Sequence, residues 1–133
     1  MTEQALKDYF ESKISANDLA KDLKDSQIST GYNGTSIHIT DIQEEGEFNV
    51  TRQHLLKLCN DTLAGSLTTL DLNTISFGLF GSDFFQWDNE TEDGAIVDQT
   101  LFEWGNPEIN YPITVENLLL WEKYLMTGKH EFN

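Results

Sequence analysis

The chain has 133 residues, 23 of them acidic and eight basic, which gives a formal net charge of -15 at pH 7. This length predicts one domain over residues 1–133 and is sufficient to bury a core without cross-links. The charge argues against nucleic acid or an anionic membrane as a ligand, because both are bound through Lys and Arg, and it favours a basic partner. An aromatic content of 11% excludes a disordered acidic tail.

The N-terminal region predicts two helices. Apolar residues recur at helical spacing over 3–14, and Thr2 is suited to cap that helix. Ser15 with Asp18 resembles a capping arrangement at the start of a second, short helix.

The next segment predicts the only β structure. Residues 35–42 alternate between apolar and polar side chains, and Glu44-Glu45-Gly46 reads as a turn before a short strand with Phe48 and Val50. We therefore expect a small antiparallel hairpin from 35 to 50.

The remainder of the chain is predicted to be mostly helical. Thr51 would cap a helix through Ala64, a second helix is expected between 69 and 82, and Thr114 would cap a last one over 115–127. Residues 88–94 read as a polar loop, and helix is favoured over strand for 95–104. The expected fold is mainly α (α+β): five to six helices in one compact domain with one hairpin.

Compartment and redox state follow from simple counts. Cys59 is the single cysteine, so no internal disulfide is expected. The N-terminus lacks the basic and then apolar pattern of a secretory signal, and no apolar run is long enough to cross a membrane. These features predict a cytoplasmic protein.

Catalytic and metal chemistry find little support in the sequence. His38, His54 and His130 stand in no recognisable nucleophile motif, so we expect no enzyme. His54 and Cys59 are five residues apart, which does not place two ligands on one helical face. The acids of 88–94 do not match a calcium-binding loop, so no metal or cofactor is expected.

The most distinctive stretch runs from Ser82 to Pro112 and mixes large rings with carboxylates. No Lys, Arg or His occurs between Lys57 and Lys123. Such a stretch is either a core beneath a solvated acidic shell or a surface for a basic partner. Five rings are expected in the core: Phe10, Phe80, Phe102, Trp121 and Tyr124. The candidate partner-binding residues are Asp83, Trp87, Asp88, Glu90, Glu92, Asp93, Asp98 and Trp104.

In character, the chain resembles the small immunity proteins of bacterial toxin–immunity systems. The features that carry this resemblance are Ser82-Asp83-Phe84-Phe85-x-Trp87-Asp88, Trp104-x-Asn106-Pro107, Tyr111-Pro112 and Trp121-x-x-Tyr124. The resemblance implies a cytosolic, non-catalytic inhibitor that neutralises a toxin domain, often a basic nuclease, by covering its active site or an exosite.

Three alternatives remain open. An acidic protein can mimic DNA and block a nucleic-acid enzyme, although the aromatic content and the N-terminal lysines argue against this. A non-catalytic adaptor would use the same surface without inhibiting anything. A small enzyme would require a deep pocket that holds His38 or His54 beside perturbed carboxylates.

Overall fold

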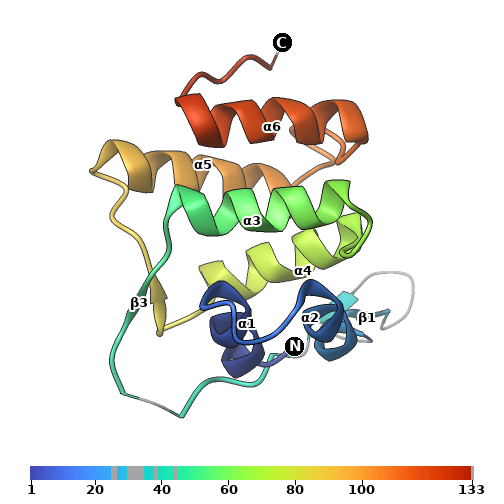
Figure 1. The fold of residues 1–133 in the computed structure, drawn as a ribbon, viewed down its shortest axis with the longest axis vertical. Coiled ribbons are helices and arrows are strands. Elements are labelled where there is room, and N and C mark those ends of the chain that lie inside the picture. Colours follow the sequence, from blue (N-terminus) through green and yellow to red (C-terminus); the bar gives the residue numbers. More distant parts are fainter. Residues whose placement is uncertain (25–26, 30–34, 38, 44, 133) are drawn as a thin grey trace.

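The computed structural model describes residues 1–24, 27–29, 35–37, 39–43 and 45–132, and this part of the chain is mainly helical (Figure 1). It contains six α-helices and four short strands, so the predicted mainly α fold is confirmed. The helices are α1 (Glu3–Phe10), α2 (Ala16–Leu23), α3 (Arg52–Leu63), α4 (Thr69–Phe80), α5 (Glu92–Gly105) and α6 (Val115–Thr127). The strands are β1 (Gln27–Ser29), β2 (Thr35–Ile37), β3 (Phe48–Asn49) and β4 (Phe85–Gln86).

A Ser or Thr residue stands at the N-cap of each of these helices. At five of them the side-chain oxygen accepts a hydrogen bond from a backbone N–H that the first helical turn leaves unpaired, and at Thr51 the backbone N–H instead donates to His54 Nδ1. The four caps predicted from the sequence are confirmed. The six N-caps are Thr2, Ser15, Thr51, Thr68, Thr91 and Thr114.

Two helix boundaries differ from the prediction by three residues or more, for local reasons. α1 ends at Phe10 instead of residue 14, and Ser12 adopts a left-handed backbone with φ of 62°, which a helix does not accommodate. α5 begins at Glu92 instead of residue 95, because the Thr91 side chain accepts a hydrogen bond from Gly94 N.

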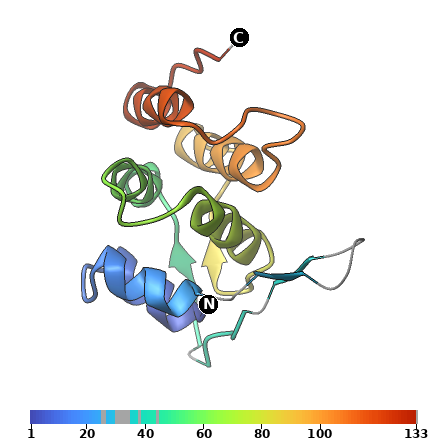
Figure 2. The same cartoon turned by 90° about the vertical axis from the view of Figure 1, so that its right-hand side faces the viewer.

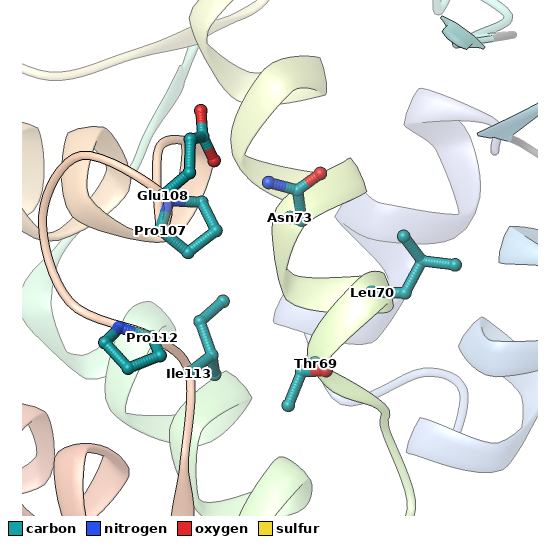
Figure 3. A pocket seen from close by; sticks show the side chains of 7 residues that line it. All are labelled: Thr69, Leu70, Asn73, Pro107, Glu108, Pro112 and Ile113. Carbon is teal, nitrogen blue, oxygen red and sulfur yellow. The ribbon is translucent and has the colours of Figure 1, made fainter. Parts of the chain in front are cut away.

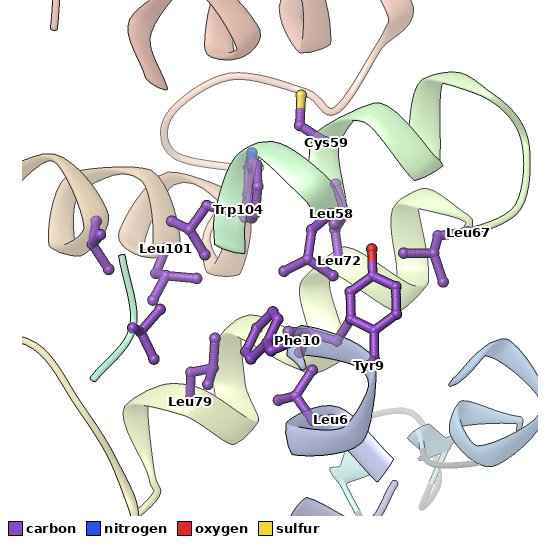
Figure 4. Packing of buried hydrophobic residues seen from close by; sticks show 14 of the residues in the cluster. Leu6, Tyr9, Phe10, Leu58, Cys59, Leu67, Leu72, Leu79, Leu101 and Trp104 are labelled. Atoms are coloured by element: carbon purple, nitrogen blue, oxygen red, sulfur yellow. The ribbon is translucent and has the colours of Figure 1, made fainter. Parts of the chain in front are cut away.

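The helices stack in layers, with α6 at one end, α3 and α5 next, then α4, and α1 with α2 at the other end (Figures 1 and 2). The core lies between these layers (Figure 4). Its labelled members include Leu6, Tyr9 and Phe10 of α1, Leu58 of α3, Leu72 and Leu79 of α4, and Leu101 and Trp104 of α5. No helix in the described residues is both long enough and apolar enough to cross a membrane.

The strands do not pair as predicted. β3 pairs with β4 in parallel, with Phe48 opposite Phe85, whereas the antiparallel pair is β1 with β2. The hairpin expected over 35–50 is therefore wrong, because its second strand has a distant partner. Ring contacts explain that choice: Phe85 meets Phe48 edge-on at 5.5 Å and Phe10 at 6.0 Å. The predicted turn residue Glu44 lies outside the described residues.

Candidate functional site

The acidic loop that begins at Asp88 is anchored by residues 82–87, which precede it. Phe84 and Phe85 are buried at 6% and 2% exposure, and their backbone N–H groups both donate to Ser82 Oγ at 3.0 Å. β4 then binds β3, and the chain comes to the surface at Trp87, which is half-buried. A buried aromatic clamp thus fixes the starting point of the acidic loop.

The loop from Asp88 to Thr91 and the first turn of α5 are held by a short hydrogen-bond network. Asp88 Oδ1 accepts from Glu90 N at 2.9 Å, and Asp88 O accepts from Thr91 Oγ1 at 2.7 Å. Gly94 permits the close approach of its own backbone, since a Cβ atom there would lie 1.8 Å from Asp88 O. The loop therefore presents its carboxylates from a defined backbone.

The six predicted carboxylates lie between residues 83 and 98 of the chain, and we call them the acidic edge. Five are exposed and one, Asp98, is half-buried. Among the described residues, no ion pair includes any of them. The acidic edge consists of Asp83, Asp88, Glu90, Glu92, Asp93 and Asp98.

Part of this charge has a local structural role. Glu92 and Asp93 occupy the first turn of α5, where negative charge is favourable to the helix dipole. Glu92 also reaches the end of α6, since its Oε1 lies 3.4 Å from the position of a Cβ at Gly128. That role explains two carboxylates at the helix start, but it does not account for the remaining four.

Trp87 and Asp98 form the point where the acidic edge meets an aromatic surface. Trp87 Nε1 donates to Asp98 Oδ1 at 3.1 Å. The Trp87 ring lies edge-on to Phe80, with centroids 5.5 Å apart, and Phe80 is 45% exposed. A partly exposed indole, a carboxylate and an exposed ring are therefore in one place, which is the composition expected of an interface anchor.

The prediction that Trp104 contacts a partner at the surface is not supported. Its side chain is 0% exposed and packs edge-on against Trp121 at 6.2 Å, between α5 and α6. Helical spacing explains its burial, because Val97, Leu101 and Trp104 share the inner face of α5. Trp104 is a core residue, and the acidic edge does not include it.

Three exposed rings were missed by sequence reasoning. Phe80 and Phe102 were expected in the core but are 45% and 41% exposed, and Phe77, which was not singled out, is 44% exposed. A signal was present in the sequence of α4, which is apolar on more than one face. A helix of that kind is covered either by its own protein or by something else.

Two of the histidines, His54 and His130, make structural contacts. His54 Nδ1 accepts from Thr51 N at 2.9 Å as part of a helix cap, and burial lowers its pKa, as does Lys57, whereas the charge of Asp93 opposes the shift. His130 Nε2 lies 2.8 Å from Glu103 Oε2. His38 lies outside the described residues.

Nucleophilic and metal chemistry gain no support from the geometry. Cys59 is buried, its thiol contacts Leu118 O at 3.3 Å, and burial raises its pKa to about 12, so the thiolate nucleophile is scarce at neutral pH. The part of the chain that the structure describes holds no cluster of three His, Cys, Asp or Glu side chains arranged for a metal ion.

Comparisons with protein-family models, with curated proteins and with solved structures find no match to this chain.

Proposed function

We propose that this chain is a cytoplasmic, non-catalytic inhibitor of the immunity-protein type, which binds and neutralises a basic, nuclease-like toxin. The observation that carries the proposal is the acidic edge itself, with five exposed carboxylates and a sixth bound to the half-buried indole of Trp87. Lys and Arg side chains of a basic cleft would meet these carboxylates, and Trp87 would supply a partly desolvated anchor beside them.

Charge of this kind acts first on the rate of encounter. Complementary potentials raise association rates toward about 10⁸–10⁹ M⁻¹s⁻¹ at low salt. These rates fall steeply as the ionic strength increases. An immunity protein benefits from fast association because it must capture a toxin before the toxin reaches its substrate. Among the residues that the structure describes, no ion pair engages the acidic edge, which supports this use because carboxylates already in ion pairs would steer a cation poorly.

The test begins with the product of the gene adjacent to the one that encodes this chain. The two proteins are co-expressed, purified through a tag on one of them, and assayed for growth inhibition with and without this chain. We expect co-purification and relief of growth inhibition. Binding without relief would support an adaptor, and competition of this chain with duplex DNA for the partner would support a DNA mimic.

A further inference from the structure

Several large apolar side chains of α4, α5 and the loop after α5 are exposed and have no cover within the described residues. Most monomeric proteins expose such residues singly, whereas a contiguous group of them marks an interaction site. The exposed fractions range from 41% for Phe102 to 70% for Ile109. We call this group the α4–α5 face: Leu70, Phe77 and Phe80 of α4, Phe102 of α5, and Ile109 of the loop that follows α5.

The register of the two helices makes these residues neighbours. α4 and α5 are antiparallel, because Asn73 near the start of α4 donates to the carbonyl oxygens of Trp104 and Gly105 at 3.1 and 3.3 Å. At the C-terminal end of α4, Trp87 contacts both Phe80 of α4 and Asp98 of α5 and so connects the two helices. Phe77 and Phe102 lie between these two contacts.

Helical spacing completes the arrangement. Leu70, Asn73, Phe77 and Phe80 follow each other at intervals of three or four residues, so they form one stripe along α4. Figure 2 shows α4 and α5 side by side, with the loop that leads to α6 extending beside them, on the side of the molecule away from α1 and α3. The α4–α5 face therefore runs from that loop to the acidic edge.

A cavity of about 500 Å³ opens at the loop end of this face. Leu70 and Asn73 line it from α4, and Pro107, Pro112 and Ile113 line it from the loop (Figure 3). The Asn73 amide points across the gap toward Pro107. This volume lies within the range of small-molecule pockets, and it is large enough to receive a bulky apolar side chain.

The charge around the face selects its occupant. Residues 58–122 contain α4, α5 and both adjoining loops, and they include no Lys, Arg or His. Glu108 stands at the cavity, and Asp98 stands toward the opposite end, where it accepts from Trp87. A second copy of this chain, with its charge of -15, would be repelled from such a surface.

We propose that the α4–α5 face is the apolar half of the partner interface, and that it receives a basic amphipathic segment of the partner. The apolar side of that segment lies along Phe77 and Phe102 and places one large side chain in the cavity. Its Lys and Arg side chains reach Glu108 at one end and Asp98 at the other. The inference rests on the proposed function. Charge on the acidic edge acts mainly on the association rate, whereas apolar contacts at the α4–α5 face would slow dissociation of the complex.

The experiment uses two synthetic peptides of about 15 residues, long enough to form a helix on the surface. One consists of Leu and Lys with Leu at helical spacing, and the other has the same Lys residues with Gln in place of Leu. Isothermal titration calorimetry measures the affinity of each for the full chain. We expect the Leu/Lys peptide to bind about tenfold more tightly, which corresponds to about 1.4 kcal/mol.

The double variant Phe77→Ser with Phe102→Ser should remove this preference and leave binding of the Gln/Lys peptide unchanged. The matched control is Leu119→Ser with Met126→Ser, two exposed apolar residues of α6 that should have no effect on either peptide. Ile109→Ser, in the loop, gives a second variant that does not alter a helix. Because all of these side chains are exposed, the variants should keep the fold.

Equal affinity for the two peptides, or an unaltered preference in the Phe77 and Phe102 variant, would overturn the inference. A dimer in solution that this variant dissociates would also overturn it, since the face would then belong to a second copy. Each of these results leaves the proposed function standing if the toxin is still neutralised. Failure of neutralisation by the unmodified chain would instead reject the proposed function itself.

Discussion

His54 completes the cap at the start of α3. Its Nδ1 accepts from Thr51 N, which requires a ring without a proton on that nitrogen, and burial lowers its pKa while Asp93 partly restores it. The unfolded chain has the ordinary pKa of about 6.5. Below that pH the unfolded state binds more protons, so protonation should break the cap and reduce stability.

This gives a pH prediction for the variant His54→Gln, whose side-chain oxygen replaces the Nδ1 acceptor without titrating. The free energy of unfolding of the unmodified chain should fall as the pH drops below about 6.5 and level off below the pKa of folded His54. The variant should lack this part of the decline. Urea unfolding at a series of pH values measures both proteins, which differ only at residue 54. Parallel profiles would contradict the assignment.

Glu103 is the second residue on which the structure depends. It is 1% exposed and accepts from Trp121 Nε1 at 2.8 Å and from Gln99 Nε2 at 3.0 Å, while His130 Nε2 lies 2.8 Å away. These bonds join α5, α6 and the C-terminal residues, so one carboxyl group satisfies donors from three segments.

Removal of the Glu103 carboxyl group should therefore leave a buried indole N–H unpaired. We expect Glu103→Leu to lower the free energy of unfolding by about 2–4 kcal/mol, measured by urea titration. Glu103→Gln keeps an acceptor for Trp121 and should cost less. Glu108→Leu, an exposed site, should change stability by about 0.5 kcal/mol at most. A cost at Glu103 no larger than at Glu108 would show that the network contributes little.

At the scale of elements, the start of α5 determines how the acidic edge is presented. The Thr91 cap, the turn at Asp88 and the absence of a side chain at Gly94 all act on the same few backbone atoms. A change in any of them moves the carboxylates relative to Trp87.

Gly94→Ala tests this arrangement. The new Cβ would stand 1.8 Å from Asp88 O, so the loop must move, and we expect a loss of about 1–3 kcal/mol in the free energy of unfolding. Gly81→Ala is the control, because its Cβ would meet nothing closer than 3.4 Å. That variant should be neutral within about 0.5 kcal/mol. Equal effects at the two glycines would mean that the close approach at Gly94 is not needed.

The elements also show what the sequence was able to predict. The helices followed from local signals, since Thr2, Ser15 with Asp18, Thr51 and Thr114 each cap the helix expected of them. The pairing of the strand at Phe48 could not be predicted from local signals. It joins Phe48 to Phe85, which is far away in the chain, and local patterns carry no information about such a partner.

The candidate site was predictable in part for the same reason. Carboxylates between Ser82 and Asp98 were placed at the surface by their chemistry alone, and the structure exposes most of them. Rings were harder, since an apolar residue in a helix can face either way. Trp104 was expected outside and is buried, whereas Phe102, two residues earlier, was expected inside and is exposed.

At the scale of the whole molecule, charge is distributed unevenly along the chain. The described ion pairs that involve lysine lie near the two ends, with Lys7 and Lys13 beside Glu11, and Lys123 beside Glu131. The middle of the chain, which contains the acidic edge and the α4–α5 face, has no cation of its own in its sequence. A basic partner would supply the missing charge, and this is the central claim.

The rate of association with the captured partner tests that claim most directly. Three molecules are compared by stopped-flow at low and at near-physiological salt: the unmodified chain, Glu90→Lys with Glu92→Lys and Asp93→Lys, and the control Glu45→Lys with Glu47→Lys and Glu116→Lys. Both triple variants change the net charge equally, and every altered residue is exposed.

We expect the variant of the acidic edge to associate at least about tenfold more slowly at low salt and to lose most of the salt dependence. The control should associate at a rate close to that of the unmodified chain. An equal effect of the two variants would show that total charge, and not the acidic edge, attracts the partner. Rates unaffected by the acidic-edge substitutions would contradict the account altogether.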